Sequence, residues 1–249
     1  MSRSFDIIER AQQDRDLFRV PPVTGSPSRG AATAGKSSPD LSGFAREEVL
    51  RLVQRIFLAA NTFGSTGLRR VVFCGIDEAD GSRLLCAQVG RILAEQTQSQ
   101  VCIVDADLRT LSSNSLADLL PLDSASLSAH EAPNAIMRKV TDNLWLVPDN
   151  SVHPDGMGLT LDDVRTWIGL HGCEFGHVVI NAPPIGLHND AVLLGQLSDG
   201  IVLVLEANST RWQTARKAKD ALESANVRVL GTVLNNRTFP IPEKLYRWL

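Results

Sequence analysis

The feature that most constrains the fold is a repeated alternation of short apolar runs with longer amphipathic stretches. The apolar runs are only as long as a strand, and some, such as Ile201–Leu205, are continuous rather than alternating. Continuous apolar strands are typical of a parallel sheet that helices cover on both faces. The sequence therefore predicts an α/β fold with a doubly wound, mainly parallel sheet and helices on both of its faces.

The expected elements follow this alternation along the chain. The predicted strands are Arg70–Cys74, Val101–Asp105, Leu144–Val147, His177–Ala182, Gly200–Glu206 and Val227–Leu234. The predicted helices are Glu47–Ala60, Ser82–Gln96, Leu161–Leu170, Asp190–Leu197 and Ser209–Ala225. In sheets of this kind ligands bind outside the carboxyl ends of the strands, so functional residues are expected there.

Residues 1–43 differ in composition from the rest of the chain. Ser4 is placed to cap a short helix that ends near Leu17. The stretch from Pro21 to Gly43 is rich in Pro, Gly, Ser and Ala and has almost no large apolar residue, so it cannot form a core. We predict a short helix and a flexible linker in residues 1–43, and one folded domain in residues 44–249.

Charge and composition limit the classes of function. The net charge of −3 argues against a basic surface field, so no nucleic-acid partner is expected. No apolar run approaches the ~20 residues that span a bilayer, and the first residues lack the apolar core of a signal peptide, so we expect a cytoplasmic protein. The four cysteines are expected to be reduced and mostly buried, and the five scattered histidines predict no metal site.

Polar residues follow four of the expected strands in a recognisable order. After the first strand, the loop Gly75–Leu84 contains two glycines and opens a helix, as a phosphate-binding loop does. The second strand ends in Asp105-Ala-Asp-Leu-Arg109, and a later strand reads Val178-Val-Ile-Asn-Ala-Pro-Pro184. The last strand reads Val229-Leu-Gly-Thr-Val-Leu-Asn235.

Together these motifs resemble the cytoplasmic ATPase domain of the bacterial tyrosine kinases (BY-kinases) that accompany capsule and exopolysaccharide export, relatives of the MinD/ParA deviant-Walker ATPases. The resemblance runs from about Glu47 to Leu249. Asp105–Arg109 resembles the second Walker A motif of these kinases, Val178–Pro184 resembles their Walker B strand, and Phe239–Arg247 is similar to a tail of proteobacterial members. The resemblance implies a P-loop NTPase-like fold and, for an intact member, ATP-dependent phosphorylation of tyrosine.

The phosphate-binding loop departs from the family pattern. A working loop ends in Gly-Lys-Ser/Thr, whose Lys reaches the phosphate oxygens and whose hydroxyl binds Mg²⁺. Here Gly81 is followed by Ser82 and Arg83, and Gly75 lies one residue too far from Gly81 for the usual spacing. These residues are therefore a degenerate nucleotide-binding set.

Charge in and beside this loop also disfavours nucleotide binding. The loop contains the acids Asp77, Glu78 and Asp80, and each like-charge contact with a phosphate costs up to about 4 kcal/mol before solvent and salt screen it. Asn181 replaces the Walker B aspartate and supplies no charge for Mg²⁺, which prefers carboxylate or phosphate oxygens. We expect no cofactor beyond weakly bound Mg²⁺-ATP.

The acids at the end of the second strand leave two interpretations open. In the first, the family's roles of base and metal ligand are kept by Asp105, Asp107 and Arg109. In the second, the two carboxylates are merely paired by Arg83 or by Arg109. We predict that Arg83 pairs with Asp105 or Asp107, because facing carboxylates need a counter-charge. Asn235 similarly either contacts a nucleotide base or ends the last strand.

Three further positions resemble family features. Asp190, which resembles a family aspartate, is expected to cap a helix. The family ends in a tyrosine cluster, whereas this chain has one tyrosine, Tyr246, for which we expect a structural role. Glu48, Arg51 and Arg55 partly match the family's oligomerisation motif, and both a ring interface and a solvated helix face fit them.

Three functions are consistent with these features, each compatible with a homo-oligomer. The first is a non-catalytic regulatory or scaffold protein of exopolysaccharide or capsule synthesis and export, docked on an inner-membrane polysaccharide co-polymerase at the inner face of the inner membrane. The losses at Ser82, Arg83 and Asn181 favour it, because they remove groups that neutralise phosphoryl-transfer charge. The second is an active tyrosine autokinase or ATPase that uses Arg83 as a displaced phosphate cation. The third is a MinD/ParA-like positioning ATPase.

Overall fold

The computed structural model describes residues 43–58, 69–77, 81–108, 115–120, 137–148 and 160–236. All of these residues lie within one structural unit, Ser38–Leu249. The predicted N-terminal helix and the predicted linker, except for Gly43, lie outside the described residues, so the division of the chain between residues 43 and 44 stays a prediction. No helix in the described ranges is both long enough and apolar enough to cross a membrane.

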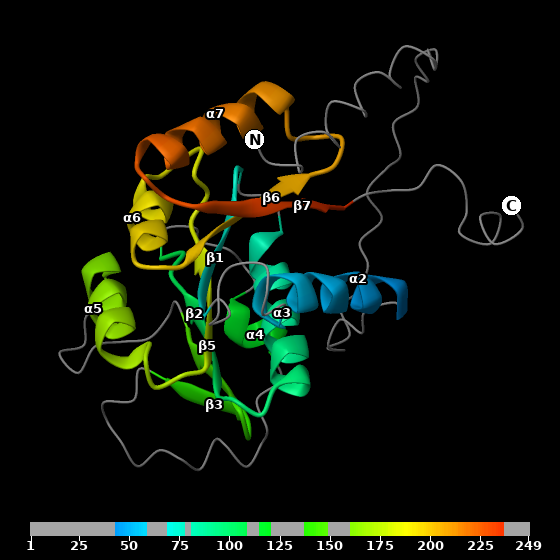
Figure 1. Cartoon of the computed structure of the whole chain (residues 1–249), viewed down its shortest axis with the longest axis vertical. Helices are drawn as coiled ribbons and strands as arrows, with labels where there is room; N and C mark the ends of the chain where they lie inside the picture. The colour runs from blue at the N-terminus through cyan, green and yellow to red at the C-terminus, as the bar shows by residue number, and fades with distance from the viewer. Residues whose placement is uncertain are drawn as a thin grey trace, which may run out of the picture. The chain divides into compact units, whose positions relative to one another are not determined.

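The strands of the described residues form one sheet in the order β3-β4-β2-β5-β1-β6-β7 (Figure 1). They are β1 (Arg70–Gly75), β2 (Val101–Asp105), β3 (Arg138–Thr141), β4 (Leu144–Val147), β5 (His177–Ala182), β6 (Gly200–Glu206) and β7 (Val229–Asn235). Neighbouring strands run parallel except β3 and β4, which pair antiparallel. The sheet is therefore mainly parallel, as predicted.

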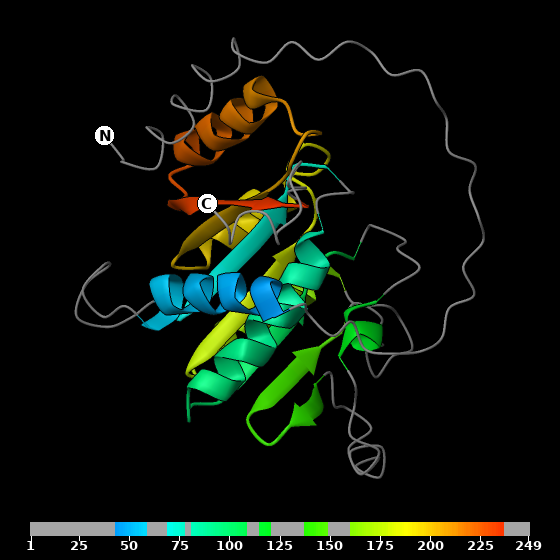
Figure 2. The same ribbon diagram turned by 90° about the vertical axis from the view of Figure 1, so that its right-hand side faces the viewer.

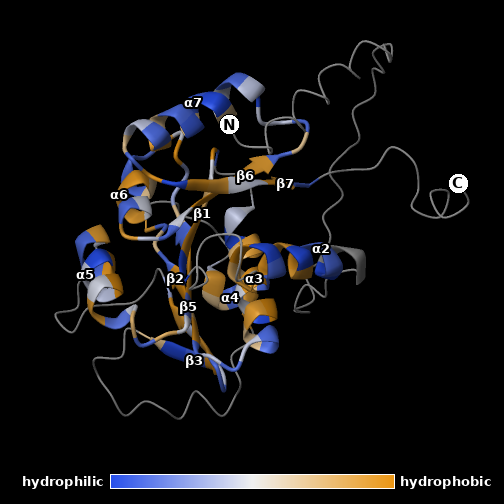
Figure 3. Ribbon diagram, in the orientation of Figure 1, coloured by the Kyte–Doolittle hydropathy of each residue, from blue (hydrophilic) through white to orange (hydrophobic). Residues whose placement is uncertain are grey.

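Helices cover both faces of this sheet, as Figures 1 and 2 show. One face carries α2 (Gly43–Val53), α3 (Ser82–Gln96) and α4 (Leu116–Leu119), and the other carries α5 (Leu161–His171), α6 (Asp190–Gln196) and α7 (Trp212–Ser224). Successive side chains of a strand point to opposite faces, so Val72 and Phe73 of β1 enter different buried apolar clusters. Figure 3 shows the hydrophobic strands between helices with hydrophilic outer sides. The predicted fold class is confirmed.

Two short elements were not expected from the sequence. In β3 Val140 is buried and the other three residues are exposed, so the strand lacks the apolar run by which the other strands were recognised. The helix α4 has four residues and begins at a capping box formed by Ser115 and Asp118. Four residues are too few to show a helical period.

The helix predicted at Glu47–Ala60 differs from the observed one at its start and in its form. It begins at Gly43, and after Val53 it continues as the π-helix η2 (Gln54–Leu58). Within η2 the side chain of Phe57 is buried. A π-turn has no distinctive residue pattern, so this change was not foreseeable from the sequence.

The expectation that Asp190 caps a helix is wrong. Asn189 holds the cap position of α6, without a side-chain capping bond, and Asp190 is the first helical residue. An acid at the first helical position is also stabilised by the positive end of the helix dipole. The sequence therefore gave no basis for choosing between Asn189 and Asp190 as the cap. Three of the four cysteines are buried free thiols, as expected, whereas Cys173 is exposed.

The strand order brings the polar strand ends together. β5 lies between β1 and β2, so the carboxyl ends of these three strands are adjacent. The register pairs Asn181 of β5 with Phe73 of β1 on one side and with Asp105 of β2 on the other. The first turn of α3, which follows the loop after β1, packs on the same face as the Asn181 side chain.

Candidate functional site

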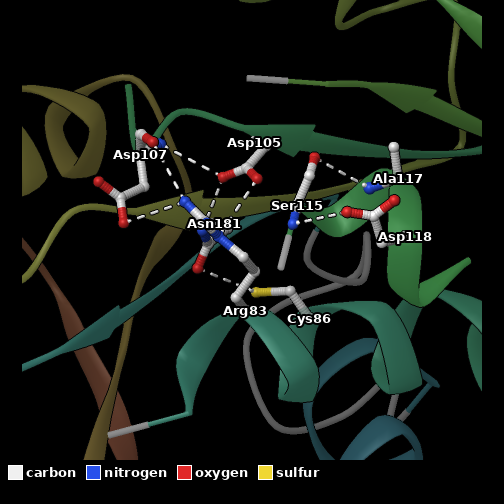
Figure 4. Close-up of polar contacts among 8 residues, drawn as sticks. All are labelled: Arg83, Cys86, Asp105, Asp107, Ser115, Ala117, Asp118 and Asn181. Atoms are coloured by element: carbon white, nitrogen blue, oxygen red, sulfur yellow. Dashed lines mark hydrogen bonds and ion pairs between the residues drawn. The ribbon is translucent and has the colours of Figure 1, made fainter. Parts of the chain in front are cut away.

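The centre of the site is an amide and a carboxylate on neighbouring strands. Asn181 and Asp105 are direct register partners, and the Asn181 Nδ2 donates a hydrogen bond of 2.7 Å to Asp105 Oδ1 (Figure 4). Both residues have no solvent exposure. The backbone N–H of Asp107 donates to the same Asp105 oxygen at 3.4 Å. Asp105 thus lies inside the protein as a hydrogen-bonded carboxylate.

Arg83 supplies positive charge to this centre from the first turn of α3. Its Nε lies 3.4 Å from Asp105 Oδ2, and its Nη2 lies 3.3 Å from Asp107 Oδ2. The Nη2 also donates to the backbone carbonyl of Asp107 at 3.2 Å. The Arg83 side chain is 11% exposed, so most of its length is buried. The predicted pairing of Arg83 is confirmed, and it extends to both aspartates.

This arrangement is one guanidinium against two carboxylates in a largely dry environment. Burial weakens solvent screening, so Arg83 and the two acids interact more strongly than surface charges at the same distances. Carboxylate oxygens that face a guanidinium are also the oxygens that Mg²⁺ would need. Among the described residues, no group of three or more His, Cys, Asp or Glu side chains is placed to hold a metal ion.

Cys86, one turn after Arg83, is a member of the site that the sequence did not indicate. Its Sγ lies 3.9 Å from Asn181 Oδ1, and the residue is fully buried. Burial raises the pKa of the Cys86 thiol well above its usual range, Asp105 and Cys74 raise it further, and Arg83 opposes them. The protonated thiol donates weakly to the amide oxygen, on the side of the amide away from Asp105. Its spacing of three residues from Arg83 was the signal available in the sequence.

The structure describes the backbone at both ends of the degenerate loop. Gly75 is the last residue of β1, and its carbonyl accepts from the N–H of Ile185 at 3.0 Å, while the carbonyl of Ile76 accepts from Gly186 at 3.1 Å. Gly81 precedes α3 with a φ of 69°, and Ser82 is the first helical residue. Asp77 is exposed, whereas Glu78 and Asp80 lie outside the described residues, as do Arg109 and Tyr246.

Comparison with known proteins identifies relatives of this chain and its fold. No family model matches the chain. The tyrosine-protein kinase YwqD of Bacillus subtilis is 25% identical over 174 residues, which are 68% of this chain and 73% of YwqD. The tyrosine-protein kinase CpsD of Streptococcus agalactiae is 38% identical over 93 residues, which are 37% of this chain and 41% of CpsD.

The chain is a homologue of bacterial tyrosine-protein kinases. Its fold is also that of the kinase domain of the Escherichia coli tyrosine kinase ETK, with a TM-score of 0.60, 19% identity and coverage of 79% of each chain. At that identity the likeness shows the fold alone. The resemblance predicted from the strand-end motifs is thus confirmed.

The segment that resembles the kinase oligomerisation motif forms the exposed side of α2 and η2. Arg51 pairs within its own helix, with Glu47 at 2.8 Å and Glu48 at 2.9 Å. Arg55 is exposed in η2. Both interpretations of these charges, a ring interface and a solvated face, place them on the surface, so their role stays a prediction.

Proposed function

We propose that the chain is a non-catalytic homologue of the bacterial tyrosine kinases, acting as a regulatory or scaffold protein in capsule or exopolysaccharide synthesis and export. The observation that carries the proposal is the position of Arg83. Its guanidinium lies against Asp105 and Asp107, the acids that in the resembling motif handle metal and phosphate. A cation of the protein itself therefore lies where a metal ion would have to face these acids.

Three replacements act together in this proposal. The Lys position holds Ser82, the Mg²⁺ hydroxyl position holds Arg83, and the Walker B carboxylate position holds Asn181. Phosphoryl transfer depends on positioning and charge neutralisation, and removal of a single such group commonly costs roughly 10²–10³ in rate. We infer that the chain has no meaningful ATPase or tyrosine kinase activity and binds Mg²⁺-ATP weakly at most.

The proposed partner follows from the kinase resemblance. A catalytically inactive kinase-like domain contributes through what it binds, so we propose docking on an inner-membrane polysaccharide co-polymerase. The chain would then act at the inner face of the inner membrane through a protein contact. A homo-oligomer that uses Glu48, Arg51 and Arg55 is compatible with this role.

An active autokinase is the second candidate, and the two aspartates favour it. Asp105 and Asp107 are kept, and Arg83 is a cation close to both of them. If Arg83 moved to a phosphate, the carboxylates would become available to a metal ion. This candidate requires that Mg²⁺-ATP compete with a buried ion pair.

Calorimetric titration with Mg²⁺-ATP and a turnover assay decide between the two candidates. We expect no micromolar affinity and no turnover for the wild-type chain, alone or with a co-polymerase. The triple variant Ser82→Lys, Arg83→Ser, Asn181→Asp is expected to recover nucleotide binding, and adding Asp105→Asn to it serves as the matched control. Micromolar affinity of the wild type, or turnover that Asp105→Asn abolishes, would overturn the proposal in favour of the kinase.

A further inference from the structure

Gly81, the last residue before α3, is constrained by more than its backbone angle. Its φ of 69° lies in the left-handed region that glycine adopts most easily. In addition, a β-carbon at Gly81 would overlap the side-chain amide nitrogen of Asn235. The loop and the end of the last strand are therefore packed against each other at this glycine.

The backbone of Asn235 is firmly held where it meets Gly81. Asn235 is the last residue of β7 and the register partner of Glu206 in β6. Its carbonyl accepts from the N–H of Ala207 at 2.9 Å. The Asn235 side chain is half-buried, and its amide nitrogen lies beside Gly81.

The start of α3, like those of α6 and α7, has no side-chain cap, whereas two other helices have one. α4 and α5 begin at capping boxes of Ser115 and Thr160, whose side chains accept backbone N–H groups. Gly81 has no side chain with which to cap α3. The turn is closed by the N–H of Leu85, which donates to the Gly81 carbonyl at 3.1 Å, and Arg83 lies within that turn.

We propose that Asn235 is a positioning residue of the site: by packing on Gly81 it holds the first turn of α3, and with it Arg83, against Asp105 and Asp107. A working phosphate loop keeps this glycine so that phosphate can approach the backbone. In this chain Gly81 serves the contact with Asn235. The inference rests on the proposed role of Arg83 as the cation of the site.

Two native thiols allow a local test. Cys86 lies one turn after Arg83 in α3, and Cys102 lies in β2; both are fully buried. Labelling by N-ethylmaleimide under native conditions, read by mass spectrometry, therefore reports local opening of α3 at Cys86 and opening of the sheet at Cys102. For Asn235→Ala we expect Cys86 labelling to accelerate about tenfold or more relative to Cys102.

Two further variants separate positioning from a general loss of stability. Asn235→Asp keeps the shape of the side chain and places a carboxylate near the start of a helix, so we expect it to restore the wild-type labelling ratio. Asn236→Gly is the matched control, because the Asn236 side chain bonds Glu206 rather than the loop, and glycine adopts its φ of 54° without strain. It is expected to leave the ratio of Cys86 to Cys102 labelling unchanged.

A double-mutant cycle tests the contact itself. Gly81→Ala carries the same backbone strain in any background, but it overlaps the amide only when Asn235 is present. We expect its effect on the unfolding equilibrium constant to be several-fold smaller in the Asn235→Ala background. Gly169→Ala, at a glycine with open space around it, should show no such coupling.

An unchanged labelling ratio in Asn235→Ala, or additive effects in the cycle, would overturn the inference. Its failure is distinguishable from failure of the proposed function, because the nucleotide titration is a separate measurement. If Mg²⁺-ATP bound with micromolar affinity while the labelling and the coupling were as expected, the proposed non-catalytic function would be wrong. The inference that Asn235 is a positioning residue would still hold.

Discussion

Two charged clusters of this chain differ in a way that distance alone does not reveal. On α2, Arg51 lies 2.8 and 2.9 Å from its two glutamates, with side chains more than half exposed. In the site, Arg83 lies 3.3 and 3.4 Å from its two aspartates, with Asp105 fully buried. The surface cluster has the shorter contacts, yet we expect the buried one to matter far more.

The two clusters differ because water can solvate a charge that has lost its partner only at the surface. When an exposed ion pair is broken, water solvates both charges, so such pairs contribute about 0–1 kcal/mol. When one member of a buried pair is removed, the other charge stays in a medium that cannot solvate it, at a cost of about 3–5 kcal/mol. Burial rather than distance therefore decides which charges this fold depends on.

The largest effect is expected for Arg83→Met, which keeps the apolar stem and removes the guanidinium. The variant leaves Asp105 and Asp107 without the cation that they face, so we expect a loss of about 3–5 kcal/mol in unfolding free energy at neutral pH. Urea denaturation measures it. Arg51→Met on α2 is the matched control. Equal losses for the two variants would mean that the site is more hydrated than its burial indicates.

A smaller effect is expected for Asn181→Asp. This change removes the amide donor to Asp105 and places a second carboxylate against it, so we expect a loss of about 1–3 kcal/mol at neutral pH. Millimolar Mg²⁺ should restore part of the stability if the two carboxylates then hold the ion. Asn143→Asp, at a half-buried amide that bonds backbone carbonyls, serves as a control whose stability Mg²⁺ should leave unchanged.

The smallest effect on stability is expected on α2. Arg51→Ala and Arg55→Ala should each change the unfolding free energy by about 0.5 kcal/mol or less, because their side chains are exposed. Sedimentation velocity then distinguishes the two interpretations of this face. A ring interface predicts that the assembly becomes smaller in both variants, whereas a solvated face predicts an unchanged sedimentation coefficient.

Much of the fold was predictable because its signals are local. β1, β2, β5 and β6 are apolar runs that the core on both faces requires, and each was expected within a residue of its bounds. β3 and α4 were missed because one buried residue or one turn leaves no period in the sequence. The π-turn of η2 was missed for a similar reason, since no residue type specifies it.

For the site, the sequence by itself determined which chemical groups are present. It shows that Ser82 stands where a Lys is expected, that position 181 is an amide, and that the acids Asp105 and Asp107 are retained. It also shows that these two acids need a counter-charge. That need identified Arg83 as a partner before any geometry was known.

Only the tertiary structure decided which groups meet. The sheet order places β5 between β1 and β2, and this order brings Asn181 beside Asp105. The contact of Asn235 with Gly81 joins residues 154 positions apart, and that of Cys86 with Asn181 joins residues 95 positions apart. Such contacts arise from the packing of whole elements, in which each side chain takes the space that the others leave, and no local pattern of residues encodes that space.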